Sequence, residues 1–387
     1  MRLIFYAILS CLWLAGCEQH LYRKDEKRTV VASPAIPIFL PTDGPVLPAA
    51  APAAPGIALA INGKIHHLLL RARTDSTRPL TTLTYFSDDD RDSQHPALVR
   101  GYDGSFTFTL RDAAGQRVFE RQLRKADFAK VGTPDIVVES AVSAPVFLGY
   151  SAALRALVFT VDFAVPDSDD GFQAVLLLGL KGQVLRLSEG RGLGGGPDCD
   201  AALAPGGRAV LTSSEIIRPN QTPLRLARAG ADLAGAFFLT DSTVLAVYDP
   251  GKNQPVRLPD GLLSYERRAT RQQQQAPNAF VVSVANGRTI SKFRYRGYYE
   301  GMGYSVPHHC LPATNTCYLL DEKQGLYLLP LAAPGAPVVL KFADMLRFAS
   351  PQGPQEVRFE MQGEDAQFAF YADATHLRRI RYQRLQD

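Results

Sequence analysis

The sequence predicts an all-β protein, and three observations support this. Beyond Gly56, apolar residues do not recur at the spacing of an amphipathic helix. Short runs rich in Val, Leu, Phe and Tyr alternate instead with turns that contain Gly, Pro, Asp and Asn. These runs form hairpin-like units that begin about 35 to 52 residues apart, close to the period of propeller blades. We therefore expect a β-propeller of about six to eight blades.

Tandem β-sandwich domains are the alternative, because hairpins at similar spacing also build sandwiches. Residues 57–145 fit the repeat least well. The alternative for this stretch is a separate β-sandwich that precedes the propeller. The expected domain organisation is a signal peptide over residues 1–16, a lipid anchor and linker over 17–56, and a propeller-like domain over 57–387.

The chain begins with a predicted signal peptide. A basic start is followed by an apolar run over residues 3–14, which is too short to cross a bilayer of ~30 Å as a helix. The run ends in Leu14-Ala15-Gly16-Cys17, which resembles the lipobox of bacterial lipoproteins. The resemblance implies transfer of diacylglycerol to the Cys17 thiol, cleavage before Cys17 and N-acylation of the new terminus. An ordinary cleaved signal and an uncleaved signal anchor are the alternatives.

Residues 17–56 are interpreted as the anchor and a spacer. A charged stretch over 18–28 precedes a segment rich in Pro and Ala, and such proline density favours extended polyproline II. At ~3.1 Å per residue, residues 29–56 span up to roughly 85 Å. The sequence thus predicts a location in the bacterial cell envelope, with lipid in a membrane and the body facing the periplasm or the cell exterior.

Seven hairpins are predicted along the body, each with an apolar run, a polar turn and a second run. The paired runs are 105–110 with 116–123; 157–162 with 174–180, followed by 183–187; 208–212 with 223–226; 244–248 with 255–258; 279–284 with 288–295; 318–320 with 326–329; and 367–371 with 377–382.

One of these runs carries a family resemblance. Residues 200–211 place Pro205-Gly206-Gly207-Arg208 directly before an apolar run. This segment resembles the turn and strand of TolB-like and YVTN-like bacterial β-propellers, and it occurs convincingly once. The resemblance implies a propeller fold for the body and carries no activity with it.

Composition excludes several functional classes. The chain has 42 basic and 38 acidic side chains, and a net charge of +4 predicts neither a nucleic-acid partner nor a strongly charged substrate. The single Trp13 lies in the signal peptide, so sialidase Asp-boxes and standard WD repeats are excluded. Neither a G-x-S-x-G elbow nor an H-E-x-x-H motif occurs. We expect a non-enzymatic protein that binds a protein or glycan partner.

An exported hydrolase or lyase acting on polysaccharide or peptide is the alternative function. Its catalytic groups would be carboxylates, or His308 and His309, at the mouth of the propeller. Paired carboxylates meet in space rather than in sequence, so spacing alone does not reveal them.

The segment 294–304 is the main candidate for ligand binding, because arginines, tyrosines and glycines alternate in it. Tyrosines present flat apolar faces with a hydroxyl, and arginines pair with carboxylates or phosphates. The alternative is that Tyr295 and Tyr298 are core strand residues followed by glycine-rich turns. The candidate ligand-binding residues are Arg294, Arg296, Tyr298, Tyr299 and Tyr304.

Cys310 and Cys317 are predicted to form a disulfide, because an exported protein meets oxidising conditions. The alternatives are two independent cysteines, or a soft-metal site that adds His308 and His309. Adjacent residues of an extended segment point to opposite faces, which argues against a shared ion. We then expect Cys199 to be left over, either buried as a small apolar residue or unpaired.

Two acidic turns are weak candidates for calcium, which needs several hard oxygen ligands. Neither turn has the Gly at position six or the Glu at position twelve of an EF-hand loop, and solvated turns are the alternative. No other cofactor is expected. The candidate ligands are Asp88, Asp90 and Asp92 in one turn, and Asp167 and Asp169 in the other.

Overall fold

The computed structural model describes residues 56–87, 94–192, 199–258, 263–300, 303–347 and 352–385. It is 59% strand and 7% helix, which confirms the predicted all-β class. Contacts divide the chain into Met1–Leu47 and Pro48–Asp387, and all described residues belong to the second unit. The lipobox cysteine Cys17 and the calcium candidates Asp88, Asp90 and Asp92 lie outside the described residues.

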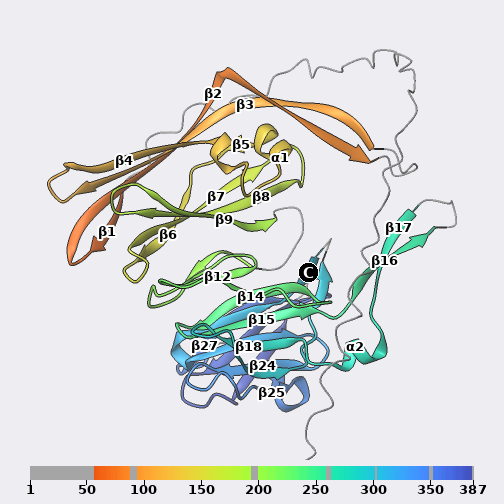
Figure 1. Ribbon diagram of the computed structural model, residues 1–387. Helices are drawn as coiled ribbons and strands as arrows, with labels where there is room; N and C mark the ends of the chain where they lie inside the picture. The colour runs from red at the N-terminus through yellow and green to blue at the C-terminus, as the bar shows by residue number, and fades with distance from the viewer. Residues whose placement is uncertain are drawn as a thin grey trace, which may run out of the picture. The chain divides into compact units, whose positions relative to one another are not determined.

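The first sheet is a four-stranded antiparallel meander with a long central hairpin (Figure 1). Asn62 and Gly63 turn the chain from the first strand into the second with φ of 50° and 75°, as a tight hairpin turn requires. The strands are β1 (Ile57–Ile61), β2 (Lys64–Ser87), β3 (Gln94–Asp112) and β4 (Arg117–Arg124).

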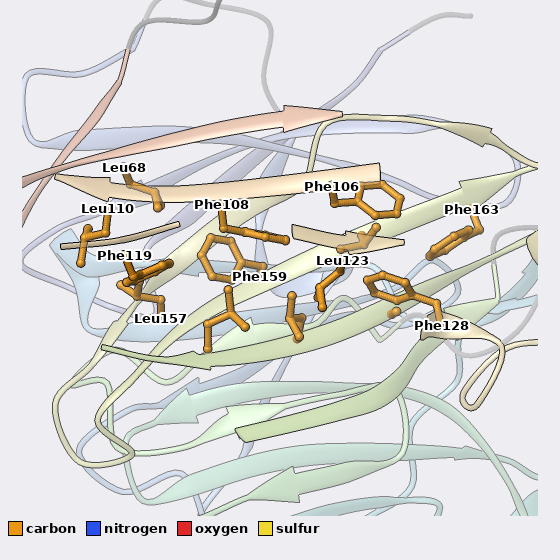
Figure 2. Close-up of a cluster of buried hydrophobic side chains, with 14 of the residues drawn as sticks. Leu68, Phe106, Phe108, Leu110, Phe119, Leu123, Phe128, Leu157, Phe159 and Phe163 are labelled. Carbon is orange, nitrogen blue, oxygen red and sulfur yellow. The ribbon is translucent and has the colours of Figure 1, made fainter. Parts of the chain in front are cut away.

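The second sheet follows directly and shares a core with the first. Phe108 of β3 meets Phe159 of the second sheet edge to face, with ring centroids 4.8 Å apart (Figure 2). Residues 57–145 thus bury their apolar face against strands that follow them in the chain. The strands of this sheet are β5 (Ala141–Val142), β6 (Val146–Ser151), β7 (Ala156–Ala164), β8 (Gly171–Gly179) and β9 (Val184–Gly192).

A short helical connection, η1 (Lys125–Phe128) and α1 (Pro134–Glu139), packs against the long hairpin. Lys125 is 2% exposed, and its ammonium donates to the carbonyl oxygens of Tyr102, Val138 and Ser140 at 3.1, 3.0 and 2.6 Å. Gly101 allows the close approach, because a Cβ there would lie 1.9 Å from the Val138 oxygen. The lysine therefore joins the end of α1 to β3.

Four further four-stranded sheets follow in chain order among the described residues. The third sheet holds β10 (Ala202–Leu203), β11 (Val210–Leu211), β12 (Glu215–Ile217) and β13 (Leu224–Arg225). The fourth holds β14 (Asp232–Thr240), β15 (Thr243–Asp249), β18 (Ala279–Ser283) and β19 (Thr289–Phe293).

The last two sheets also have four strands each in the described part of the chain. The fifth holds β22 (His308–Leu311), β23 (Thr316–Asp321), β24 (Gly325–Pro330) and β25 (Val338–Lys341). The sixth holds β26 (Leu346–Arg347), β27 (Glu356–Gln362), β28 (Gln367–Asp373) and β29 (Ile380–Arg384). Around the fourth and fifth sheets lie the hairpins β16 (Lys252–Arg257) with β17 (Leu263–Arg268) and β20 (Tyr298–Glu300) with β21 (Gly303–Ser305), and the helix α2 (Arg271–Gln275).

Consecutive sheets pack face to face because their central strands are apolar on both sides. In β15, Val244 belongs to the core with the third sheet, whereas Leu245 belongs to the core with the fifth. In β23, Leu319 faces the fourth sheet and Tyr318 faces the sixth. Strands buried on both faces read as continuous apolar runs, and this explains why these segments lack strict alternation.

Five of the seven predicted hairpins are paired as expected, and two predictions were wrong. Residues 208–212 do not pair with 223–226, because β12 lies between them. Residues 244–248 do not pair with 255–258, because both edges of β15 are occupied by β14 and β18, and β16 pairs with β17 instead.

An aspartate closes one central strand in each of the last three sheets. Asp249, Asp321 and Asp373 end β15, β23 and β28. Each accepts, through Oδ1, the backbone N–H two residues later, at 2.7, 3.1 and 2.8 Å respectively. Such a bond starts a turn at the strand end. The repeat therefore gives three sheets the same kind of loop, and two of these loops border the site described next.

Candidate functional site

A pocket of about 300 Å³ lies where the loops after β15 and β19 meet the β20–β21 hairpin. All five predicted ligand-binding residues line it: Arg294, Arg296, Tyr298, Tyr299 and Tyr304. The other lining residues are Pro250, Gly251, Ala269, Gln274, Tyr295, Gly297 and Glu364.

Tyr295 fixes the backbone that carries the two arginines. It is 2% exposed, its N–H donates to Asn278 Oδ1 at 2.8 Å, and its hydroxyl donates to the Leu320 oxygen at 2.7 Å. Burial raises the pKa of Tyr295 well above its usual value. Because neighbours in an extended segment alternate, the anchored Tyr295 leaves Arg294 and Arg296 exposed on either side of it.

The β20–β21 hairpin presents two tyrosines with different roles. Tyr299 and Tyr304 are cross-strand partners, and their rings meet edge to face at 5.2 Å. The Gly297 N–H donates to the Tyr304 hydroxyl at 2.6 Å, and burial raises the pKa of Tyr304 to about 12. The Tyr299 hydroxyl donates to Asp249 Oδ1 at 2.6 Å, while the side chain stays 47% exposed. Tyr304 therefore holds the hairpin, whereas the Tyr299 ring is partly exposed in the pocket wall.

A second, smaller cavity of about 10 Å³ adjoins the pocket and shares Arg296, Tyr298 and Glu364 with it. Its wall includes Asp321, which is fully buried. Asp321 Oδ1 accepts two backbone N–H groups, whereas Oδ2 has no hydrogen-bond partner among the described residues. The volume is about that of one water. Burial raises the pKa of Asp321, although two backbone hydrogen bonds, Arg296 and Arg294 lower it.

Asp321 and Glu364 were missed by reasoning from the sequence. They come from the β23–β24 and β27–β28 turns, whereas the predicted residues are contiguous in the chain. The aspartate that ends three central strands is the signal that points to Asp321. No comparable signal marks Glu364, whose place in the wall depends on the packing of separate sheets.

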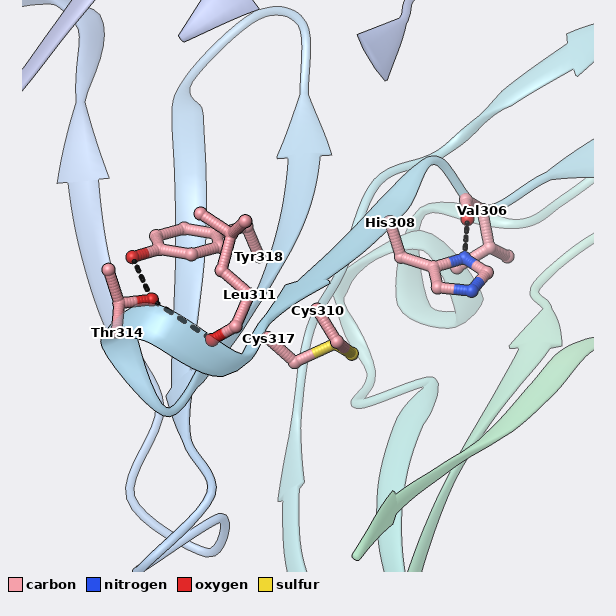
Figure 3. The surroundings of a disulfide bond; sticks show 7 residues. All are labelled: Val306, His308, Cys310, Leu311, Thr314, Cys317 and Tyr318. Atoms are coloured by element: carbon pink, nitrogen blue, oxygen red, sulfur yellow. Dashed lines mark hydrogen bonds between the residues drawn. A yellow bond between two sulfur atoms is a disulfide. The ribbon is translucent and has the colours of Figure 1, made fainter. Parts of the chain in front are cut away.

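Cys310 of β22 and Cys317 of β23 are cross-strand neighbours joined by a disulfide (Figure 3). The His308 ring stacks on Phe237 with centroids 3.7 Å apart, and its Nδ1 lies 2.8 Å from the Val306 oxygen. The His309 ring stacks on Phe359 of the sixth sheet at 5.1 Å, and burial lowers its pKa. The two rings thus pack on different sheets.

The remaining candidates lie apart from the pocket wall. Asp167 and Asp169 are exposed in the turn between β7 and β8. Cys199 is buried in the core between the third and fourth sheets. Within the described residues, no group of three or more His, Cys, Asp or Glu side chains is placed to hold a metal ion. In the same part of the chain, no helix has the length and apolar character needed to cross a membrane.

Comparison with known proteins adds no family to this picture. No protein-family model matches the chain, and no curated protein is significantly similar to it. Any function must therefore be inferred from the residues of the pocket.

Proposed function

We propose that this protein is a lipid-anchored binding protein of the bacterial cell envelope. Its β-sheet body takes a protein or glycan partner into the tyrosine and arginine pocket and does not transform it. One observation carries the proposal: the exposed Tyr299 ring and the side chains of Arg294 and Arg296 line one pocket of about 300 Å³. That volume is at the lower end of the range for small-molecule sites.

The alternative of an exported hydrolase or lyase draws little support from the two histidines. Both imidazole rings are used in packing, His308 on Phe237 and His309 on Phe359. A general acid or base must reach the proton that it transfers, and neither histidine lines the pocket. The acidic residues that do line the cavities are Glu364, Glu322 and the buried Asp321.

We also propose that the six sheets are blades of a propeller. Three features support this: consecutive sheets share cores in chain order, most of them are four-stranded meanders, and an aspartate ends the same kind of central strand in three of them. Propeller mouths are formed by loops at one end of the blades, and the pocket is built from loops of the last three sheets.

Binding is tested with the full-length protein in detergent on arrays of envelope-type oligosaccharides and peptides. We expect at least one class to bind. We expect Tyr299→Ala to weaken binding about tenfold, because loss of an aromatic stacking contact costs about 1.4 kcal/mol of binding free energy. Tyr85→Ala is the matched control, because Tyr85 is 60% exposed on β2 and does not line the pocket.

Two results would overturn the proposed function. One is binding that Tyr299→Ala and Tyr85→Ala affect equally, because the pocket would then not be the site. The other is release of product from any bound oligosaccharide or peptide, lost in Glu364→Gln, because this would make the protein an enzyme.

A further inference from the structure

Two arginines in the pocket have no acidic partner at contact distance among the described residues. Arg294 and Arg296 are exposed, and neither forms an ion pair within 4.0 Å with another described residue. Some arginines elsewhere do form ion pairs, for example Arg381 with Glu356. A guanidinium has a rigid fork of donors that matches a carboxylate. The pair therefore offers a site for an anionic group.

The rest of the wall resembles a surface for sugars more than one for apolar side chains. Among the described lining residues there is no Leu, Ile, Val or Phe. The apolar surface comes mainly from tyrosine rings, and Tyr299 is 47% exposed. An aromatic ring packs against the C–H face of a sugar. The Tyr299 hydroxyl donates to Asp249 and can still accept a hydrogen bond from the ligand. A peptide would instead need a pocket for an apolar anchor.

Acceptors for hydroxyl groups stand beside the donors. Glu364 is exposed and lines both cavities, and Gln274 lies in the same wall. Asp249 is buried and does not itself line the pocket, but its Oδ1 accepts from the Tyr299 hydroxyl and the Gly251 N–H of the wall. Sugar hydroxyls donate and accept at once, so a wall that mixes carboxylate, amide and guanidinium groups suits them.

We propose that the pocket binds an acidic oligosaccharide. The ligand's carboxylate lies on Arg294 and Arg296, one sugar face lies on the Tyr299 ring, and Glu364 accepts from sugar hydroxyls. This inference rests on the proposed binding function and narrows it to one chemical class. The preference for an anionic ligand comes from the two arginines of the pocket, because the net charge of the whole chain is only +4.

The test is calorimetric titration of the full-length protein in detergent with a linear trimer of galacturonate. Its fully methyl-esterified form and a neutral glucose trimer are the matched ligands. We expect the acidic trimer to bind at least tenfold more tightly than either, the ratio that one charge-assisted bidentate contact implies. Binding should weaken with added salt, because an exposed ion pair is screened.

Substitutions of the two arginines test where the carboxylate of the ligand binds. Arg296→Gln and Arg294→Gln should each weaken binding of the acidic trimer about tenfold and leave the neutral trimer unchanged. Arg296→Lys should recover part of the affinity, since it keeps the charge and loses the fork. Arg100→Gln is the control of equal charge change, because Arg100 is exposed on β3 and is not in the pocket wall.

The outcomes separate the two proposals. Equal affinity for acidic and esterified trimers, lost in Tyr299→Ala, overturns the acidic class and leaves the binding function intact. The same holds if triglycine binds more tightly than triglycine amide in an Arg296-dependent way while the sugars do not bind, because the ligand is then a peptide carboxylate. Failure of every probe to respond to either Tyr299→Ala or Arg296→Gln overturns both.

Discussion

At the scale of single residues, two aspartates in equivalent positions show how surroundings determine charge. Asp373 ends β28 and accepts hydrogen bonds from the Thr375 side chain and from backbone N–H groups, which lower its pKa to about 2. Asp321 ends β23 with similar backbone bonds, but burial outweighs them and raises its pKa. Hydrogen bonds favour the charged form, whereas loss of water disfavours it. Ionisation of Asp321, the more deeply buried of the two, therefore costs stability.

This difference predicts a pH effect of Asp321→Asn. Because the folded pKa of Asp321 lies above its unfolded value, the stability associated with the protonated form is present at acidic pH and is lost as pH rises through the folded pKa. Asparagine resembles the protonated form and does not ionise. The melting temperature of the variant minus that of the wild type should therefore increase from pH 4 to pH 8.

Thermal unfolding monitored by circular dichroism measures this difference. Asp169→Asn is the control, because Asp169 is exposed in the β7–β8 turn, and its difference curve should stay flat. A flat curve for Asp321→Asn as well would contradict the burial argument.

The sequence predicted some residues of the pocket and not others for a physical reason. Arg294 to Tyr304 lie within one short segment, so the mixture of charge and aromatic rings is visible in the chain itself. Asp321 and Glu364 reach the same place only because the fourth, fifth and sixth sheets pack together. The composition of one segment reveals the arginines and tyrosines of the pocket. Asp321 and Glu364 join them only through tertiary contacts.

At the scale of elements, the β22–β23 hairpin is closed twice, by its strand register and by the Cys310–Cys317 disulfide. A cross-link with a sequence separation of seven removes loop entropy from the unfolded chain. We expect reduction with dithiothreitol to lower the free energy of unfolding by about 2 kcal/mol.

Denaturant unfolding with and without reductant measures this effect. The double variant Cys310→Ala, Cys317→Ala is the control, in which dithiothreitol should have no effect. If the reductant leaves the wild-type protein unchanged, the disulfide does not contribute to stability in solution.

The hairpins that sequence reasoning placed correctly and wrongly differ in one respect. Where an apolar run, a tight turn and a second run follow each other, as in residues 279–295, the partner is local and the prediction holds. After β15, the sequence correctly predicts the turn that begins at Asp249. The strand beyond this turn, β16, leaves the sheet and pairs with β17. The residues of a turn determine where the chain bends. Which strand the next segment pairs with depends on whether the edges of the preceding strand are already occupied.

At the scale of the whole molecule, the five shared cores join each sheet to the next in the chain. The continuous apolar runs of β7, β15 and β23 predicted strands. Because these strands are apolar on both faces, each needs a neighbouring sheet on either side to bury them. The order of sheets was predictable from hairpin spacing, since each unit packs on its neighbour. The closure of such an array into a ring depends on contacts between sheets far apart in the sequence, which spacing does not encode.

The proposed anchor makes a prediction about where the full-length protein is found. In a bacterial host, the wild type should fractionate with membranes and incorporate labelled palmitate, because multiple acyl chains hold a protein stably. Cys17→Ala should lose the label and shift at least tenfold toward the soluble fraction or accumulate unprocessed.

Cys11→Ala is the matched control, because Cys11 lies within the apolar run and fits the lipobox pattern less well. It should keep both the label and the membrane location. Label that persists in Cys17→Ala would contradict lipidation at Cys17.

The buried ammonium of Lys125 has a consequence for chemical reactivity. Burial lowers its pKa to about 8, so a far larger share of this amine is unprotonated near neutral pH than in an ordinary lysine. Three carbonyl oxygens enclose it while α1 is seated. We expect an added amine-reactive ester to acylate Lys125, with release of its alcohol, only when α1 lifts from β3. The resulting amide has one N–H donor and could not replace the three hydrogen bonds of the ammonium. The rate at which such an ester labels Lys125 would therefore report how often the helix opens.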